Sequence, residues 1–455
     1  MPSPVKLPLR EPLSLAAASL SVATLVSLSP AALVRWGPAG RNYFTATLLL
    51  PADIALGGVL VLCLPTVIGA IRSRRIGPGA AGWAGITAVM VWSFVWHPSG
   101  RGGLTLLHLA GCAMLAAAGA QVLRSPTARS ALAKAIVGGG VLEALIALLQ
   151  VSRQGALGLS RWVEVNPPFY PFQHIRAPNA TFPHPYVAAG FGLVSAGVAV
   201  VMAMTADERA RPRWAAAAGW CVLPVGVSYS RSALLALLAF GLALIWIALR
   251  QSDRRTTALA AMAALAIGSA VPAAIWHTQW LARGSSTVAG SFTGGAAASG
   301  GVVSGVANGR LTDYHQALTL LGDHPLTGVG VGRYVFAVEH QFGLANAPRS
   351  TGYVNANDLP LLAGAEGGVL ALVVMAGTLV WLLWRAARAG PLALGVCLAF
   401  LPYCLLDQFP YESAQGAVIC GLWLATVDAL ILGVARRPVP GFEGAGSGQS
   451  ISPSV

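Results

Sequence analysis

Apolar runs of about twenty residues recur along the whole chain, and they constrain its fold more than any other feature. A helix of that length can cross the hydrocarbon layer of a membrane. Hydrophobic residues make up 55% of the 455 residues and only 10% are charged. The chain lacks the alternation of polar and apolar faces that is typical of soluble domains. The sequence therefore predicts an all-α polytopic membrane protein.

The apolar runs predict twelve spans, an even number that places both termini on one side of the membrane. The spans lie near residues 13–34, 50–71, 79–96, 103–123, 130–150, 185–206, 213–229, 232–249, 257–276, 360–384, 391–406 and 415–435. They divide the chain into nine membrane helices within 1–276, a large, partly helical periplasmic loop at 277–359, three membrane helices within 360–437 and a disordered cytoplasmic tail at 438–455.

The net charge of +13 is distributed unevenly about these spans. On the side of the termini lie 18 of the 29 Lys and Arg residues, and the remaining 11 lie opposite. Short basic loops stay in the cytoplasm, so both termini are expected there. We therefore interpret the positive charge mainly as a topology signal, with no nucleic acid as a partner.

Six cysteines all fall inside predicted spans, and no pair has the spacing of metal ligands. They are Cys63, Cys112, Cys221, Cys397, Cys404 and Cys420. We interpret them as small packing residues, and no metal or other cofactor is predicted.

Two ionisable residues at membrane depth need an explanation, because burying such groups is costly. We interpret His108 as a packed, locally hydrogen-bonded histidine. Glu143 fits a helix–helix contact and a role in a site equally well.

Polar side chains concentrate between residues 308 and 359, the longest segment that cannot lie in the membrane. The Gly-rich tract at 284–309 before it predicts a flexible tether. From Arg310 the pattern predicts a helix, which His324-Pro325 ends. Its shared face is expected to carry Leu311, Tyr314, Leu318 and Leu321. In the turn at 327–334, glycines at every second position allow backbone amides to approach a ligand.

Basic residues also mark two short connections on the loop side of the membrane. Arg176 and His184 flank a turn that leads into the span at 185–206, and Arg231 lies between two short spans. A guanidinium presents a planar fork of donors suited to phosphate oxygens. Arg231 would also begin a helix, whose N-terminal amides favour an anion. The alternative for these residues is anchoring at the membrane interface.

Several short motifs, in this order, resemble those of the O-antigen ligase and polymerase superfamily of bacterial envelope proteins. The motifs are Arg176 with Thr-Phe-Pro-His-Pro (181–185), Ser-Arg-Ser-Ala-Leu-Leu (230–235), Gly-Arg-Leu-Thr-Asp-Tyr-His-Gln-Ala-Leu (309–318), His-Pro-Leu-Thr-Gly-Val-Gly-Val-Gly (324–332) and Ala-Glu-Gly-Gly (365–368). The likeness covers roughly residues 130–435 and is specific for the superfamily rather than for one member.

The resemblance implies a metal-independent glycosyltransferase of the bacterial cytoplasmic membrane. Its donor would be a glycan on undecaprenyl pyrophosphate, and its acceptor a glycan or glycolipid in O-antigen, lipopolysaccharide or exopolysaccharide assembly. Other polysaccharide-assembly proteins would be its partners. Arg231 and Arg310 would hold the pyrophosphate and stabilise the leaving group, with Arg176 and His184 at the border of the same site. Arg333, Arg349 and Asp358 are the further residues expected to bind substrate.

One departure from the superfamily concerns the residue that activates the acceptor. The family carries a histidine in a His-Asn motif before the closing span, whereas this chain has Asn-Ala-Asn-Asp-Leu-Pro at 355–360. Counting back from Ala-Glu-Gly-Gly places Asn357 at the histidine position, and matching Asn-Asp directly places Ala356 there. Neither side chain accepts a proton near neutral pH. His340, Glu339 and Asp358 are the candidate replacements.

Two alternatives to a membrane glycan ligase or polymerase remain at this point. The first is a catalytically silent relative that binds the lipid-linked glycan and assists a partner. The second is a polytopic transporter, although the spans show no clear internal repeat and few charges at mid-membrane. Asp428 and Glu366 are the residues on which a transport path would depend.

Overall fold

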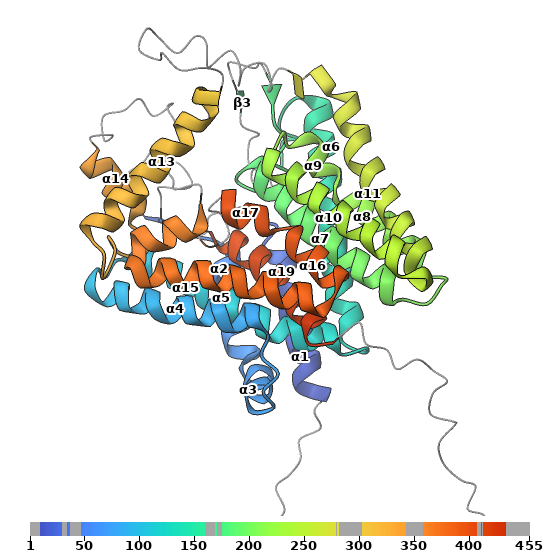
Figure 1. Ribbon diagram of the computed structural model, residues 1–455, viewed down its shortest axis with the longest axis horizontal. Coiled ribbons are helices and arrows are strands. Elements are labelled where there is room, and N and C mark those ends of the chain that lie inside the picture. The colour runs from blue at the N-terminus through green and yellow to red at the C-terminus, as the bar shows by residue number, and fades with distance from the viewer. Residues whose placement is uncertain are drawn as a thin grey trace, which may run out of the picture.

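Long apolar helices make up most of the fold in the computed structural model (Figure 1). The structure describes residues 10–29, 34–36, 47–159, 169–170, 175–278, 280–281, 303–342, 358–406, 411 and 413–433. Among these residues, eight helices are long and apolar enough to cross a membrane, and nine if one bent pair is a single span. The chain is therefore an all-helical, multi-pass membrane protein.

The helices in chain order are α1 (Arg10–Val26), α2 (Pro51–Leu62), α3 (Leu64–Arg72), α4 (Pro78–Trp96), α5 (Gly100–Arg124), α6 (Arg129–Arg153), α7 (Pro185–Thr205), α8 (Arg211–Cys221), α9 (Leu223–Val227), α10 (Arg231–Arg250), α11 (Arg255–Ile275), α13 (Val303–Asp323), α14 (Tyr334–Gln341), α15 (Leu359–Ala389), α16 (Pro391–Leu398), α17 (Leu401–Leu406) and α19 (Ala414–Ile431). A short 3-10 helix, η2 (Ser252–Arg254), precedes α11. Two antiparallel pairs join β1 (Val34–Trp36) to β2 (Thr47–Leu49) and β3 (Phe169–Tyr170) to β4 (Ile175–Arg176), and neither pair was predicted.

The eight candidate spans coincide with eight of the predicted ones. They are α4, α5, α6, α7, α10, α11 together with η2, α15 and α19. The bent pair of α2 and α3, with 47° between its halves, covers the prediction at 50–71. The three other predicted positions hold shorter helices, namely α1, the pair of α8 and α9, and the pair of α16 and α17. The count of twelve spans and the membrane sidedness stay predictions.

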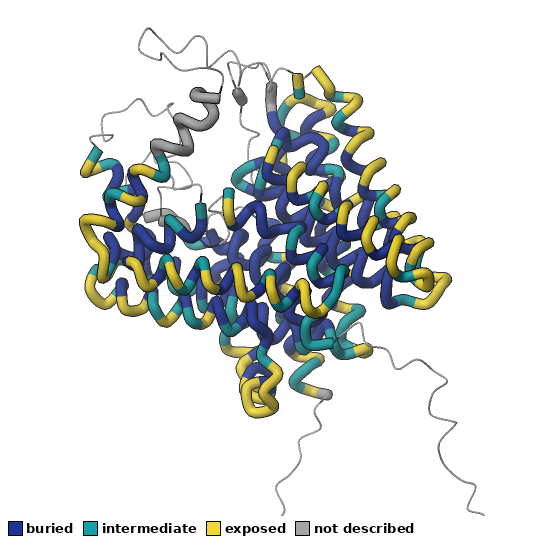
Figure 2. The backbone as a smooth tube through the Cα atoms, in the orientation of Figure 1, coloured by how far each residue is buried: buried dark blue, intermediate teal, exposed yellow. Residues whose placement is uncertain are grey.

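The centre of the bundle is formed by helices that are apolar on every side. All residues of α7 except Tyr186 are buried, as are residues 414–430 of α19. A helix without a polar face has no stable position at a water surface, which explains why these two lie inside (Figure 2). The helices α10, α11 and α15 instead expose apolar side chains, such as Leu249, Ile267 and Val380, on a surface suited to lipid.

Small residues bring neighbouring helices into close contact, as expected for packing in lipid. The clearest case is the crossing of α8 and α11 at Gly219 and Gly268. A methyl group on Gly268 would lie 2.0 Å from the carbonyl oxygen of Gly219, and one on Gly219 would lie 2.7 Å from that of Ala264. Only glycine permits the two backbones to approach this closely.

The predicted helix at Arg310 is confirmed, with one difference in its packing. It begins at Val303 and ends at Asp323, directly before His324-Pro325. Leu318 was expected on the packed face but is 52% exposed. Leu321 is buried as expected, together with Ala317 and Leu320, and α13 packs on α15.

Candidate functional site

The glycine-rich turn after α13 docks on a break in α15. At Gly368 the backbone of α15 has φ 80° and ψ −177°, which interrupts the helical hydrogen bonds. The freed groups bind the turn: Val329 and Gly330 donate their amides to the carbonyls of Ala365 and Glu366, at 2.9 and 3.2 Å. Val369 donates in return to the carbonyl of Pro325 at 2.8 Å. The turn and the helix break therefore form one unit.

The glycines of this turn approach protein atoms rather than leaving their amides open to a ligand. Gly328, Gly330 and Gly332 all have positive φ. A methyl group on Gly328 would lie 2.2 Å from the backbone carbon of Glu366, and one on Gly330 would lie 2.6 Å from Cβ of His97. The expected approach to a ligand is not what these glycines show, because the atoms they approach belong to α15 and to the end of α4.

A buried carboxylate occupies the concave side of the turn. Glu366 is 2% exposed, and its Oε1 accepts the amide of Tyr334, the first residue of α14, at 3.2 Å. The amide of Gly332 also donates to this carboxylate. The other oxygen, Oε2, accepts the hydroxyl of Tyr411 at 3.1 Å. Successive amides that converge in this way bind anions, and here the anion is part of the chain.

The hydrogen bonds continue from Tyr411 to the start of α2. The carbonyl oxygen of Tyr411 lies 3.3 Å from Nδ1 of His108, whose Nε2 lies 2.6 Å from Oδ1 of Asp53. Oδ2 of Asp53 accepts the amide of Leu50 at 2.6 Å, which caps α2. The prediction of a packed, hydrogen-bonded histidine is confirmed. Sequence reasoning missed Asp53 as its partner, although an acidic residue and a histidine in neighbouring spans were a signal for pairing.

Cationic side chains surround the turn where it meets α4 and α5. Arg333 and His324 are exposed, and His97 is half-buried with its Nε2 3.3 Å from the hydroxyl of Thr327. Burial lowers the pKa of His97, and the positive charges of Arg333 and His324 lower that pKa further. His97 is therefore neutral near pH 7. The guanidinium of Arg101 lies 5.6 Å from the ring centre of Phe336 in α14 and attracts the Glu366 carboxylate.

A second set of buried polar groups holds residues 177–182 between α6 and α7. Glu143 accepts the amide of Thr181 at 3.0 Å and its hydroxyl at 2.7 Å. Oε1 of Gln150 accepts the amides of Asn179 and Ala180. Residues 177–182 are all buried, so this part of the connection enters the bundle. Glu143 therefore anchors the segment between Arg176 and His184, so its partner is a connecting segment rather than a second helix, and a role in a site stays a prediction.

The segment after Arg176 contacts the segment before Arg231. Ala177 and Tyr229 form a small buried cluster against Trp280, and the rings of Tyr229 and Trp280 lie 5.3 Å apart. Tyr229 has φ 55°, an uncommon value for a residue with a side chain. Burial raises the pKa of Tyr229 to about 12, so its hydroxyl stays protonated. The two connections predicted to carry cationic groups therefore meet at one end of the bundle.

Arg231 is the first residue of α10, as predicted, and its side chain is exposed. The preceding Ser230 caps the helix, because its hydroxyl accepts the amide of Ala233 at 3.2 Å. The short helix α17 packs against both α10 and α15 and lies between them in Figure 1. The start of α15 is capped in turn by Asp358, whose Oδ1 accepts the amide of Leu361 at 2.8 Å.

The other predicted site residues are distributed as follows. His184 is half-buried and caps α7 by accepting the amide of Tyr186 at 3.4 Å. Arg333 directly precedes α14, and His340 is exposed in its last turn. Arg310 lies in α13 and Arg176 in β4, where the structure describes the backbone only. Asn357 and Arg349 lie outside the described residues.

The two carboxylates on which a transport path would depend both bind backbone amides. Asp428 of α19 accepts the amides of Gly79 and Ala80 at 2.9 Å each, which caps α4 at the end opposite the turn. Glu366 binds the turn as described above. These hydrogen bonds explain why each acidic residue can be buried, and no role in transport is needed to explain it.

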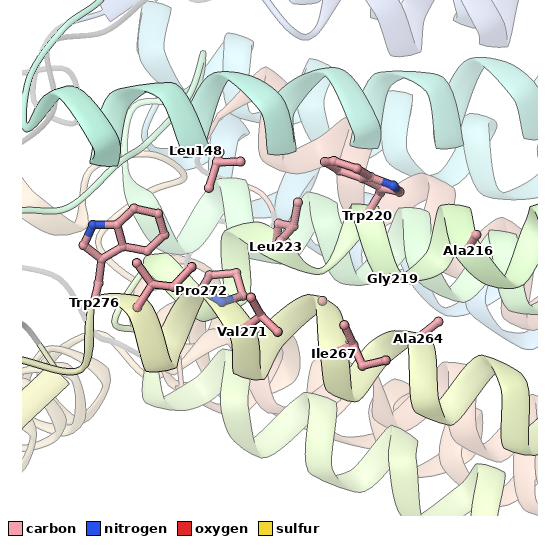
Figure 3. Close-up of a pocket in the computed structure, with 12 residues that line it drawn as sticks. Leu148, Ala216, Gly219, Trp220, Leu223, Ala264, Ile267, Val271, Pro272 and Trp276 are labelled. Atoms are coloured by element: carbon pink, nitrogen blue, oxygen red, sulfur yellow. The ribbon is translucent and has the colours of Figure 1, made fainter.

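An apolar groove of about 410 Å³ lies elsewhere, between α6, α8, α9 and α11 (Figure 3). No residue that lines it is charged. It is lined by Leu148, Ala216, Gly219, Trp220, Leu223, Ala264, Ile267, Gly268, Val271, Pro272, Ile275 and Trp276. Such a lining suits hydrocarbon and cannot hold a phosphate by itself.

Replacing Glu143 with alanine is expected to destabilise the protein by about 2–4 kcal/mol, because two buried donors of Thr181 lose their acceptor at about 1–3 kcal/mol each. Thermal unfolding in detergent measures the change. Glu143→Gln, which keeps an acceptor oxygen, should lose clearly less. Equal unfolding temperatures for the alanine variant and the wild type would show that the Thr181 contact does not anchor the segment.

Comparison with known families gives a match at residues 215–376, to the model of a family described as O-antigen ligase. The match begins before Arg231 and ends within α15, so it includes Arg310, Arg333 and Asp358. Comparison with curated proteins gave no match.

Proposed function

We propose that this member of the O-antigen ligase and polymerase superfamily transfers a saccharide from undecaprenyl pyrophosphate to an acceptor glycan. The observation that carries the proposal is that the matched segment contains most of the elements that carry the predicted site residues. Arg231, α13, α14 and the start of α15 all belong to that segment. Transfer would take place on the periplasmic side of the bacterial cytoplasmic membrane, where the sequence predicts the loop at 277–359 to lie.

In the proposed reaction, an acceptor hydroxyl attacks the anomeric carbon of the donor sugar. The bond between that carbon and the pyrophosphate oxygen breaks, and the electron pair leaves with the polyprenyl pyrophosphate. Arg231 and Arg310 stabilise the charge that develops on the leaving oxygen, and Arg176 and Arg333 contact the outer phosphate or the glycan. Arg231 suits this role because it stands exposed at the start of α10, where the helix amides add a positive potential.

The proton of the acceptor hydroxyl needs an acceptor of its own. Asn357 cannot take it, and Asp358 already accepts the amide of Leu361 as the cap of α15. His340 is exposed in the last turn of α14, and imidazole is the side chain that most often serves as a general base. We assign the proton to His340 or to bulk water, which makes the wild-type protein a slow transferase.

Replacing Asn357 with histidine is therefore expected to raise the transfer rate by about 10- to 100-fold, somewhat less than the 10²- to 10⁴-fold typical of a well-placed base. The test compares purified wild type, Asn357→His and His340→Ala with an undecaprenyl-pyrophosphate oligosaccharide and a glycan acceptor. An unchanged or lower rate for Asn357→His would show that another group already serves as base. If transfer is then lost in His340→Ala, His340 is that base.

A further inference from the structure

Glu366 stands where four parts of the chain meet. Its carboxylate receives the amides of Gly332 and Tyr334 and the hydroxyl of Tyr411. Its carbonyl oxygen receives the hydroxyl of Ser93 in α4, at 2.6 Å, and the amide of Gly330. By contrast, the carboxylate of Asp323, at the end of α13, accepts a hydrogen bond from Gln341 of α14 and makes no such link to a membrane helix among the described residues.

The carboxyl oxygens of Glu366 matter because of the groups that face them. The amide of Tyr334 is at the N-terminus of α14, where the helix carries a partial positive charge. The guanidinium of Arg101 attracts the same carboxylate, and its Nη1 is buried without a hydrogen-bond partner among the described residues. Removing the carboxylate would leave buried amides unpaired and an arginine uncompensated, so the turn would lose its hold on α15.

The element that this carboxylate fixes carries predicted site residues at both of its ends. Arg333 directly precedes α14 and His340 lies in its last turn. Because α14 has only eight residues and begins at the bound amide, a shift of the turn moves both side chains together. The same helix also carries Phe336, whose ring is contacted by the guanidinium of Arg101 from α5.

We propose that Glu366 is a positioning residue, which holds α14 and therefore Arg333 in place to bind the pyrophosphate of the donor. This inference rests on the proposed function for the identity of the ligand. It predicts that the two carboxyl oxygens of Glu366 are needed for donor affinity although they do not touch the donor.

The first measurement is independent of any ligand. Hydrogen–deuterium exchange of the intact protein in nanodiscs is compared for wild type, Glu366→Ala, Glu366→Gln and Asp428→Asn. Amides within 328–341 should exchange about 10- to 100-fold faster in Glu366→Ala, because local opening becomes easier when their acceptor is lost. Asp428→Asn is the matched control, since it neutralises a buried carboxylate at the other end of the bundle. It should leave these amides unchanged.

The second measurement is the dissociation constant of undecaprenyl pyrophosphate in the same nanodiscs. Glu366→Ala should raise it at least about tenfold, which corresponds to the loss of one well-placed contact. Glu366→Gln keeps the shape and one acceptor oxygen, so it should recover part of the affinity. A merely structural defect would lower the fraction of protein that binds and leave the dissociation constant unchanged, as we expect for Asp428→Asn.

The outcomes separate this inference from the proposed function. Unchanged exchange in Glu366→Ala would overturn the fixing of the turn, and faster exchange with unchanged donor affinity would overturn the positioning role. A wild type that binds undecaprenyl pyrophosphate without transferring a glycan would overturn the proposed transfer alone. A wild type that does not bind it would overturn both.

Discussion

Replacing Arg231 with alanine is expected to lower kcat/KM for glycan transfer by about 10²- to 10³-fold, the usual cost of removing one preplaced donor at a developing negative charge. The side chain is exposed at the first residue of α10, beside the segment that follows Arg176. A guanidinium keeps its charge at any physiological pH and can bind two phosphate oxygens at once. Steady-state kinetics with a lipid-linked oligosaccharide measures the change.

Two further substitutions make this result specific. Arg231→Lys keeps the charge but not the planar fork, so it should recover only part of the activity. Arg250→Ala removes an arginine from the last residue of the same helix and should transfer at the wild-type rate. If Arg231→Ala and Arg250→Ala are equally active, Arg231 is an interfacial anchor and the proposed site is wrong.

Replacing Gly328 with alanine is expected to destabilise the protein by about 2–5 kcal/mol. A left-handed backbone costs an alanine about 1–2 kcal/mol, and overpacking a closed contact adds about 1–3 kcal/mol. Gly328 has φ 63°, and its added methyl group would lie 2.2 Å from the backbone of Glu366. The helix break of α15 cannot move away without losing its hydrogen bonds to the turn. Thermal unfolding in detergent and protease cleavage near residue 328 report the loss.

The control for this substitution is Gly322 in α13, six positions earlier in the chain. A methyl group there would meet no atom within 4 Å. Alanine favours a helix over glycine by about 1 kcal/mol, so Gly322→Ala should leave the unfolding temperature unchanged or raise it slightly. Wild-type stability of Gly328→Ala would contradict the docking of the turn on α15.

The membrane helices could be predicted because each is specified by its own residues. Apolar runs such as those of α7 and α10 are long enough to define a span without knowledge of the neighbours. Arg231 was correctly expected at the start of a helix, since it follows a capping serine and precedes an unbroken apolar run. The pair of α16 and α17 covers only Pro391–Leu406 and is shorter than a full span, although its residues are apolar.

The site was less predictable, because its contacts join residues that are far apart in the chain. Glu366 and Tyr411 are hydrogen-bonded across 45 positions, and His108 and Asp53 across 55. From the sequence, Glu366 could be identified as an acidic residue inside a span and as part of the Ala-Glu-Gly-Gly motif, but its hydrogen-bond partners could not. The exposure of Leu318 was missed for the same reason, because the packing of α13 on α15 joins residues that are far apart in the chain. Glycines at every second position indicated a close approach, but the residues that they approach are set by the tertiary fold.

The most direct test of the central claim is product analysis by mass spectrometry. Purified wild type in nanodiscs is incubated with an undecaprenyl-pyrophosphate oligosaccharide and a glycan acceptor. The proposal predicts an acceptor that gains the mass of the oligosaccharide less one water, together with free undecaprenyl pyrophosphate in equal amount. Intact donor and unmodified acceptor after prolonged incubation, also with Asn357→His, would contradict the assignment as a glycan transferase.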